Sequence, residues 1–315
     1  MIILITGVAG FIGSHLAEKL LLADELIIGI DNLDNFYDPE IKRKNISSFA
    51  QNKNFIFYEG DVRNAEFLKK IFSSHRIDVT VHLAAKAGVR PSIFSPKEYY
   101  DVNMNGTINI LESIKDLDVK KIVFASSSSV YGNKENIPFS ENDNVDYPIS
   151  PYAASKKAGE LLCHSYYHLY GFDITCLRFF TVYGPRQRPD LAINKFASAI
   201  LNDELITFYG NGNTTRDYTY IDDIVNGILK AIDHLNGYRI YNLGESKVVS
   251  LKQMVETLEK ELNKKANLQL LPMQPGDVFK TCADISKARK ELGYSPRWAF
   301  EDGIKEFVKW KLYNI

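Results

Sequence analysis

Short apolar runs alternate with helix-like stretches through the first part of the chain. The runs are rich in β-branched residues and lie at residues 2–6, 26–30, 55–58, 79–85, 122–125 and 173–180. Between them, apolar residues recur with helical spacing at residues 14–22, 65–73, 103–114 and from 151 to near Gly171. Continuously apolar strands are typical of a sheet that is buried on both faces. The alternation therefore predicts an α/β fold, a Rossmann-type doubly wound parallel sheet with helices on both sides.

The pattern becomes less regular after residue 180. We expect strands at 206–210 and 241–244, a loop at 210–220, and helices at 222–233, 251–262 and 300–312. The prediction is a Rossmann-type domain at 1–180 and a smaller C-terminal α/β lobe at 181–315, which closes a cleft over the first domain. The boundary near residue 180 is approximate, and strands from the later segments can join the main sheet. Residues 34–53, helical near 41–49, are expected to cover the domain rather than to link two parts.

Glycines crowd the turn after the first strand. Gly7, Gly10 and Gly13 stand where strand meets helix, so the backbone can approach a pyrophosphate and free amides can meet its charge. The second strand ends in Asp31, eighteen residues past Gly13, near where a carboxylate takes the ribose hydroxyls of an adenosine. That carboxylate would repel a 2′-phosphate. The pattern predicts a site that prefers NAD to NADP, over the alternative of a glycine turn with a surface aspartate.

A serine run and a tyrosine–lysine pair follow the fifth apolar run. The serines at residues 126–129 come at the carboxyl end of a predicted strand, where open α/β sheets place their ligands. Ser150 and Pro151 form a sound helix start, and Tyr152 and Lys156, four residues apart, share one helix face. An ammonium beside a phenol favours the phenolate, which would make Tyr152 a base near neutral pH. The alternative is a plain amphipathic helix face beside a solvated serine loop.

Charge and composition exclude several classes of partner. Of the 315 residues, 45% are hydrophobic and 24% are charged, and the net charge is −1. This balance argues against a nucleic acid or an acidic membrane surface and favours a small neutral or anionic ligand. No apolar run approaches the roughly 20 residues of a membrane span. The chain begins with a strand-like segment, which leaves no room for a signal peptide.

The cysteines and histidines indicate no metal site. Cys163, Cys176 and Cys282 are widely spaced and form no C-x-x-C motif. This spacing argues against a zinc site or a disulfide framework and fits a reducing cytoplasm. His82 lies in an apolar run, so we expect a satisfied core histidine rather than a ligand. The sequence thus predicts a cytoplasmic protein without a metal ion.

Several motifs together resemble one enzyme family. GVAGFIG, Asp31, Asp61-Val62, HLAA, SSSSVYG and PYAASK are similar to those of the extended short-chain dehydrogenase/reductase family, specifically its nucleotide-sugar epimerase branch. The likeness covers nearly the whole chain. RFFTVYGPRQRPD, GNGNTTRDYTYIDDIV, QPGDV and ADISKARKELGY resemble the UDP-glucuronate 4-epimerases more than the UDP-galactose 4-epimerases, which usually carry Asn-Pro where this chain has Thr181-Val182.

The resemblance implies a catalytic set, a bound NAD and a UDP-sugar substrate. Ser127, Tyr152 and Lys156 match the catalytic Ser/Thr, Tyr and Lys. The implied NAD contacts are Gly7, Gly10, Phe11, Ile12, Gly13, Asp31, Asn32, Asp61, Val62, Leu83, Ala84, Ala85, Lys86, Asn103, Ser126, Tyr152 and Lys156. The implied substrate contacts are Val89, Arg90, Ser127, Ser128, Thr181, Arg188, Arg216 and Asp277. Among these, Arg216 matches an arginine on the diphosphate, an anion that suits a bidentate guanidinium.

The resemblance also separates related reactions. Related 4,6-dehydratases and decarboxylases generally place an acid just after the catalytic hydroxyl, where this chain has Ser128 and Ser129. Without that carboxylate there is no evident base for removing the C5 proton, so we predict simple 4-epimerisation of UDP-glucuronate to UDP-galacturonate through a 4-keto intermediate. Arg188 would face the C6 carboxylate together with Thr181. The alternative is that Arg188 only pairs with Asp190 at the surface.

Other functions stay open at this point. UDP-glucose/UDP-galactose 4-epimerisation needs the same machinery and differs only at C6, and Phe279 and Thr281 leave the sugar side of the pocket undecided. A non-catalytic NAD-binding sensor would usually lack the tyrosine or the lysine. The resemblance further implies a homodimer through the helices at 103–114 and 151–170.

Overall fold

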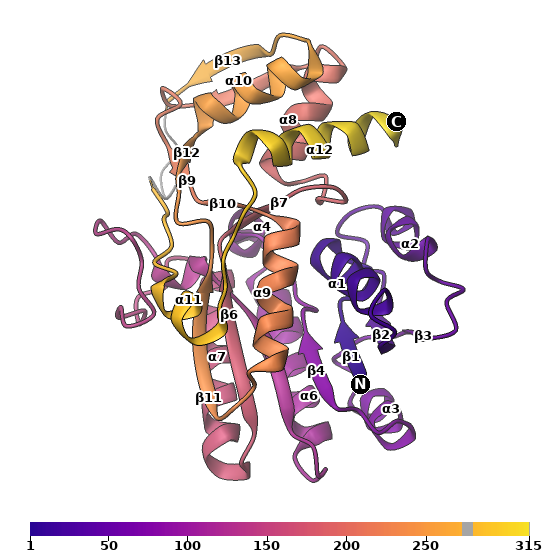
Figure 1. Cartoon of the computed structure of the whole chain (residues 1–315). Helices are drawn as coiled ribbons and strands as arrows, with labels where there is room; N and C mark the ends of the chain where they lie inside the picture. Colours follow the sequence, from indigo (N-terminus) through magenta and orange to yellow (C-terminus); the bar gives the residue numbers. More distant parts are fainter. Residues whose placement is uncertain (273–279, 315) are drawn as a thin grey trace.

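Seven parallel strands form the central sheet of the protein (Figure 1). The computed structural model describes residues 1–272 and 280–314. The strands are β1 (Ile2–Thr6), β2 (Leu26–Asp31), β3 (Phe55–Glu59), β4 (Val79–His82), β5 (Lys121–Ser127), β6 (Asp173–Phe179) and β11 (Tyr238–Leu243). Their spatial order is β11-β6-β5-β4-β1-β2-β3, so the chain winds outward from β1 in both directions. This order confirms the predicted doubly wound sheet.

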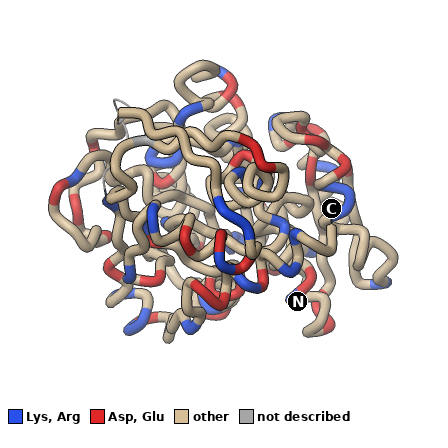
Figure 2. The backbone as a smooth tube through the Cα atoms, turned by 90° about the horizontal axis from the view of Figure 1, so that it is seen from above, with Lys and Arg blue, Asp and Glu red and all other residues tan. Residues whose placement is uncertain are grey.

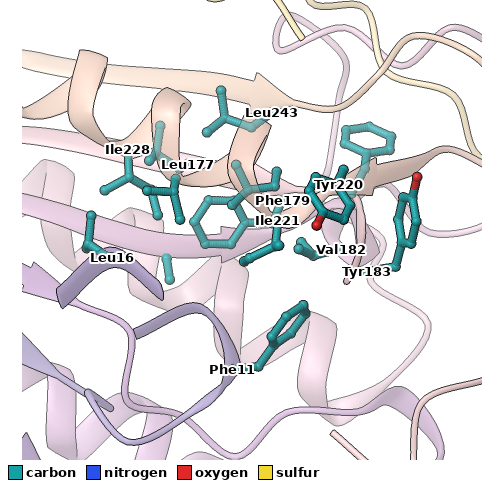
Figure 3. Packing of buried hydrophobic residues seen from close by; sticks show 14 of the residues in the cluster. Phe11, Leu16, Leu177, Phe179, Val182, Tyr183, Tyr220, Ile221, Ile228 and Leu243 are labelled. Carbon is teal, nitrogen blue, oxygen red and sulfur yellow. The ribbon is translucent and has the colours of Figure 1, made fainter. Parts of the chain in front are cut away.

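Helices cover both faces of this sheet. They are α1 (Phe11–Leu21), α2 (Pro39–Ser47), α3 (Ala65–Ser74), α6 (Gly106–Ile114), α7 (Pro151–Tyr170) and α9 (Ile221–Asp233). Ile3 belongs to one core, with Leu16 of α1 and Ile228 of α9 (Figure 3). Leu4 belongs to a second core, to which α3, α6 and α7 contribute. Successive strand residues enter different cores because their side chains point to opposite faces.

Several later elements lie beyond the carboxyl ends of the strands, at the top of Figure 1. They include α8 (Ala192–Leu201), β8 (Leu205–Tyr209), α10 (Leu251–Leu262), β13 (Asn267–Leu271) and α12 (Phe300–Tyr313). β8 pairs with β13 in a small sheet of their own. β11, by contrast, pairs with β6 and so extends the main sheet. The part of the chain after residue 180 therefore contributes both to the small β8–β13 sheet and to the main sheet.

The expectation of a loop at 210–220 was wrong. This stretch contains β9 (Thr215–Arg216) and β10 (Tyr218–Tyr220). β9 pairs with β12 (Val249–Ser250), and β10 pairs with β7 (Thr181–Tyr183). Strands of two or three residues have no periodicity that a sequence pattern could reveal. Their pairing depends on partners more than thirty residues away.

Several short elements near the serine run were not predicted. They are α4 (Val89–Phe94), α5 (Pro96–Tyr100), the π-helical turn η1 (Asp101–Asn105), the 3-10 turn η2 (Ser128–Tyr131) and, further along, α11 (Ser286–Leu292). The helix expected at 103–114 accordingly begins at Gly106, after η1. The tyrosine helix was predicted correctly: α7 has Ser150 as its N-cap and ends at Gly171, whose φ is 67°.

Charged residues of both signs are interspersed over the view in Figure 2. Among the residues described, no helix is long and apolar enough to cross a membrane. Within the same ranges, no group of three or more His, Cys, Asp and Glu side chains is arranged to hold a metal ion. The three cysteines are free, and two of them, Cys163 and Cys176, are buried.

Candidate functional site

The glycine turn lies between β1 and α1 and exposes backbone rather than side chains. Gly7 has a φ of 72°, and its N–H donates to Ile30 O at 2.7 Å. A Cβ atom at Gly13 would lie 2.1 Å from Gly7 O, and one at Gly7 would lie 2.8 Å from Ala84 N. Side chains at these positions would therefore break the turn. α1 begins at Phe11, three residues before the predicted start, because the glycines let the helix enter the turn itself.

The first residues of α1 and the end of β4 surround this turn. Gly10 is the N-cap of α1, and Phe11 and Ile12 form its first turn. Leu83 N donates to Thr6 O at 3.2 Å, and Ala84 N donates to Thr6 Oγ1 at 3.2 Å. The predicted NAD contacts of α1 and of the segment after β4 thus lie side by side at the carboxyl end of the sheet.

Asp31 ends β2 and ties two backbone segments together. Its Oδ2 accepts from Ala9 N at 3.0 Å, and its Oδ1 accepts from Leu33 N at 2.9 Å. The side chain is buried, and this burial raises the pKa of the carboxyl above its ordinary value. Asp31 therefore joins the glycine turn to the start of the excursion that follows β2.

A second carboxylate lies at the end of β3. Asp61 Oδ2 accepts from Asn32 Nδ2 at 2.9 Å, and Arg63 forms an ion pair with the same oxygen at 2.8 Å. The hydrogen bonds from Arg63 hold the pKa of Asp61 at about 2, so Asp61 is ionised at neutral pH. Val62, the next residue, is buried. The structure thus brings Asn32, Asp61 and Val62 together as predicted, and it adds Arg63.

Lys86 forms ion pairs and hydrogen bonds that the sequence did not indicate. Its Nζ lies 2.9 Å from Asp34 Oδ1 and 2.8 Å from Glu98 Oε1. Its backbone N–H donates to Asn103 Oδ1 at 2.8 Å, and Asn103 Nδ2 donates back to Lys86 O at 3.0 Å and to Ser155 Oγ at 2.9 Å. The segment of Ala85 and Lys86 is therefore fixed to the tyrosine helix through Asn103.

Ser127 and Tyr152 come together at the end of β5. Their side chains are hydrogen-bonded, and the bond favours the phenolate. Ser127 Oγ also accepts from Ser129 Oγ at 2.9 Å and from Ser129 N at 3.2 Å, which leaves its own proton for the phenol. Burial outweighs these effects and raises the pKa of Tyr152 above its ordinary value. The serine hydroxyl and the phenol therefore meet at the carboxyl end of β5.

Lys156 does not lower the pKa of Tyr152 as expected. Its Nζ donates to Ala125 O at 2.7 Å and lies 5.3 Å from the centre of the Phe124 ring. Burial lowers the pKa of this ammonium to about 8. The two side chains share a helix face, but the lysine points onto β5, where the ammonium donates to a backbone carbonyl. The positive group with a resolved effect on Tyr152 is instead Arg188, whose charge lowers the pKa of the phenol.

Ser126 and Ser128 flank Ser127 and have different surroundings. Ser126 Oγ donates to Glu160 Oε1 at 2.6 Å, in the interior. Glu160 also accepts from Arg178 Nε and Nη2, each at 2.8 Å, and Arg178 Nη1 donates to Tyr131 OH at 3.0 Å. Ser128 opens η2 and is half-buried. The hydroxyl of Ser126 is therefore committed to a buried network, and only its backbone is left for a ligand.

Arg188 has the surface partner that the sequence suggested as an alternative. Its Nε and Nη2 donate to Asp190 Oδ1 and Oδ2 at 2.9 and 2.6 Å, and Nη2 also donates to Ala87 O at 3.2 Å. Its positive charge nevertheless lowers the pKa of Tyr152. Thr181 lies at the start of β7, where its N–H donates to Asp217 O at 3.0 Å. Arg188 is thus both a partner of Asp190 and a neighbour of the tyrosine.

The other residues predicted to contact the substrate lie on separate elements. Val89 and Arg90 begin α4, directly after Gly88, and Arg216 lies in β9. The carboxylate of Asp217, next to Arg216, accepts from Glu245 N at 2.8 Å and from Ala283 N at 2.9 Å. Asp277 and Phe279 lie outside the described residues. Thr281 is engaged with backbone, because its Oγ1 accepts from Asp217 N at 3.3 Å.

His82 is a satisfied core histidine, as expected. Its Nδ1 pairs with Thr6 Oγ1 at 2.7 Å and its Nε2 with Thr107 Oγ1 at 3.1 Å. Burial, with a smaller effect of Lys156, lowers the pKa of His82 to about 3. The ring is therefore neutral at physiological pH and acts as a polar link between strands and α6.

Sequence reasoning missed several residues that shape the site. They are Asp34, Phe36, Arg63, Glu98, Tyr99, Glu160, Arg178 and Asp217. Glu160 had a usable signal, since it stands one helical turn after Lys156. Tyr99 had none: its ring packs edge-on against that of Tyr152, with centres 6.2 Å apart, and its hydroxyl donates to Ala87 O at 3.1 Å.

Comparison with known proteins agrees with this arrangement. A family model described as "GDP-mannose 4,6 dehydratase" matches residues 4–307. The chain belongs to this extended short-chain dehydrogenase/reductase family. The UDP-glucuronate 4-epimerase of Thermodesulfobacterium geofontis is 46% identical over 313 residues, which cover 99% of this chain and 96% of the relative.

Solved structures of family members have the same fold. The UDP-glucuronic acid 4-epimerase of Bacillus cereus, in complex with UDP-glucuronic acid and NAD, is 38% identical with a TM-score of 0.94, and the match covers 100% of both chains. The UDP-glucose 4-epimerase of Thermotoga maritima, with UDP-glucose, is 32% identical with a TM-score of 0.89, covering 100% of this chain and 99% of that one. Family members with this fold therefore include epimerases of two different UDP-sugars.

Proposed function

We propose that the protein catalyses the NAD-dependent 4-epimerisation of a UDP-sugar, with UDP-glucuronate and UDP-galacturonate as the substrate pair. The observation that carries the proposal is the hydrogen-bonded pair of Ser127 and Tyr152 at the carboxyl end of β5, within reach of the charge of Arg188. A relative with 46% identity and a solved structure with 38% identity, both UDP-glucuronate 4-epimerases by name, support it.

The glycine turn and Asp31 fit a dinucleotide. The turn tolerates no Cβ at Gly13, so backbone packs closely there, and the amides of the first turn of α1, from Phe11 on, would meet a pyrophosphate. Asp31 stands at the end of the next strand for a ribose. Asn32, Asp61 and Val62 would surround the adenine. When bound, NAD supplies a reversible acceptor for the C4 hydride and a positive ring that favours the phenolate of Tyr152.

The chain's own residues move the proton. Tyr152 as phenolate takes the proton of the C4 hydroxyl and later returns it to the C4 oxygen on the opposite face of the sugar. Ser127 donates to the phenol, which favours the basic form. Lys156, anchored on Ala125 O, adds a fixed positive charge in the same region. Because the sugar must present both faces, the protein has to hold the UDP part and let the sugar turn.

Residues beyond the tyrosine divide between the two ends of the substrate. We assign Arg216, Val89 and Arg90 to the UDP part, since a guanidinium suits a diphosphate. Asp277 has the same proposed role. We assign the C6 carboxylate to Arg188 and Thr181, which follow β6 in the chain.

The second candidate is UDP-glucose/UDP-galactose 4-epimerisation. A solved family member with UDP-glucose favours it, at 32% identity. The two candidates differ at C6, where one substrate carries a carboxylate and the other a hydroxymethyl group. A positive Arg188 beside Tyr152 favours the carboxylate.

Turnover without added cofactor tests the proposal. The purified protein is incubated separately with UDP-glucuronate and UDP-galactose, and the sugar nucleotides are separated afterwards. We expect UDP-galacturonate from the first and little UDP-glucose from the second, with no NAD supplied because it co-purifies. Conversion of UDP-galactose alone would select the second candidate, and conversion of neither would refute the assignment.

We also propose that the protein works as a homodimer in the cytoplasm. α6 and α7 pack against each other, and α7 exposes Leu161 and Leu169, which are 56% and 65% accessible. Exposed leucines on a helix of the sheet layer suit an interface with a second copy. Three free cysteines suit a reducing compartment. Sedimentation that shows only monomer at micromolar concentration would contradict the dimer.

A further inference from the structure

Phe36 lies between two cations of the site. Its ring centre is 5.2 Å from Cζ of Arg188 and 5.6 Å from Nζ of Lys86. The residue belongs to the excursion after β2, which begins at the adenosine side with Asp31. One half-buried ring therefore links this excursion to the arginine beside Tyr152.

The excursion is anchored independently of Arg188. Asp34 Oδ1 accepts from Phe36 N at 2.9 Å and from Lys86 Nζ at 2.9 Å, while Lys42 Nζ donates to Asp34 O at 2.7 Å. Glu98 holds the other side of Lys86 at 2.8 Å. Phe36 is thus part of a fixed wall rather than a loose loop tip.

Arg188 is held on several sides. Asp190 takes Nε and Nη2, Ala87 O takes Nη2 as well, and the Phe36 ring contacts the guanidinium. Among the described residues, Nη1 has no hydrogen-bond partner. A guanidinium packed against an aromatic ring keeps its in-plane N–H groups available, so Nη1 is the group that can donate to a carboxylate. Phe36 and Asp190 together orient Nη1.

We propose that Phe36 is a positioning residue for Arg188 and thereby sets the share of the 4-keto intermediate that loses its carboxylate. The inference rests on the proposed function. A C4 ketone is β to the C6 carboxylate, and decarboxylation needs the C5–C6 bond aligned with the carbonyl π system. When Phe36 keeps Arg188 in one orientation, the guanidinium holds the carboxylate out of that alignment. Without the ring, Arg188 can rotate while still bound to Asp190, and the carboxylate is no longer held.

The side reaction balances with the cofactor as oxidant. Tyr152 takes the C4 hydroxyl proton and the nicotinamide takes the C4 hydride, which gives the ketone. The C5–C6 bond then breaks, C6 leaves as carbon dioxide, and its electron pair forms a C4–C5 enolate that takes a proton at C5. Release of the resulting UDP-4-keto-pentose leaves one reduced cofactor on the protein. Each failure of positioning therefore leaves two products that can be counted, the pentose and the reduced nicotinamide.

Phe36→Leu tests the proposal, because it keeps apolar volume and removes the π face. With the NAD-loaded protein and UDP-glucuronate, we expect the ratio of UDP-4-keto-pentose to UDP-galacturonate to rise about threefold to tenfold, with a matching rise in reduced nicotinamide. Phe36→Tyr should restore the ratio of the unaltered protein. Calorimetry should also show weaker binding of UDP-glucuronate relative to UDP-glucose in Phe36→Leu.

Phe49→Leu is the matched control. It removes another ring of the same excursion, one that packs on Phe55 with ring centres 5.0 Å apart. Equal increases in Phe36→Leu and Phe49→Leu would show a general loosening and overturn the inference, as would an unchanged ratio in Phe36→Leu. If the unaltered protein does not convert UDP-glucuronate, both the proposed function and this inference fall. If it does, and only the ratio stays unchanged in Phe36→Leu, the inference falls alone.

Discussion

Glu160 and Arg178 form a two-armed ion pair in the interior, directly behind the strand end that carries Ser127. Both hydrogen bonds measure 2.8 Å, and each side chain is 1% exposed. Ser126 Oγ donates to the same carboxylate at 2.6 Å. The pair therefore joins β5, β6 and α7 next to the strand end that carries Ser127.

Arg178→Met should lower the free energy of unfolding by about 3–5 kcal/mol, because it leaves a buried carboxylate without its main partner. Replacing both residues by Met should recover much of that loss, since apolar side chains of similar volume can fill the space. Urea denaturation measures both changes. As a control, Glu306→Gln removes the exposed pair with Lys309 and should cost less than about 1 kcal/mol. A double variant less stable than Arg178→Met would contradict this account.

Tyr152→Phe should reduce kcat by about a hundredfold to ten-thousandfold, since it removes the proposed base and little volume. Cofactor content after denaturation should stay close to that of the unaltered protein. Turnover is measured by separating the sugar nucleotides. Near-normal turnover in this variant would exclude Tyr152 as the base.

Ser127→Ala should move the acid limb of the pH profile of kcat/KM to higher pH. The hydrogen bond from Ser127 lowers the pKa of Tyr152, so its loss raises that pKa, and the phenolate then forms only at higher pH. Ser129→Ala is the control, because Ser129 donates to Ser127 and makes no recorded bond to the phenol. An acid limb at the original pH in Ser127→Ala would show that the serine does not tune the base.

Asp31→Ala should weaken binding of NAD and reduce the preference for NAD over NADP, since no carboxylate would then repel a 2′-phosphate. It also leaves Ala9 N and Leu33 N without their acceptor, so a loss of about 1–3 kcal/mol in stability is expected alongside. Titration of the cofactor-free protein with both dinucleotides gives the ratio of dissociation constants. An unchanged ratio would remove Asp31 from the ribose site.

Arg188→Ala should slow turnover of UDP-glucuronate and raise the share of decarboxylated 4-keto pentose, with much less effect on UDP-galactose. Asp190→Asn keeps the guanidinium and loses one arm of its support, so a smaller change is expected. Product analysis on both substrates measures the effect. Equal losses on the two substrates with no new product would leave Arg188 as a surface partner of Asp190 only.

The sequence by itself determined the elements whose causes are local. Buried β-branched runs became the strands of the main sheet, and the glycine turn and Asp31 came to adjacent strand ends. α7 begins and ends where Ser150 and Gly171 predicted, because a capping hydroxyl and a left-handed glycine act within one helical turn.

Only the tertiary structure decided which groups meet across the fold. Lys156 turned from Tyr152 to Ala125 O, since burial leaves an ammonium in need of the nearest acceptor. Arg178 pairs with Glu160, and Phe36 contacts Arg188. No sequence pattern indicates these contacts, because the connecting loops do not show where the next segment packs. The sequence specifies the chemistry of each side chain, but hydrogen bonds and ion pairs form only between groups that lie within a few ångströms in space. The partners of a charged group are therefore fixed only when distant segments pack together.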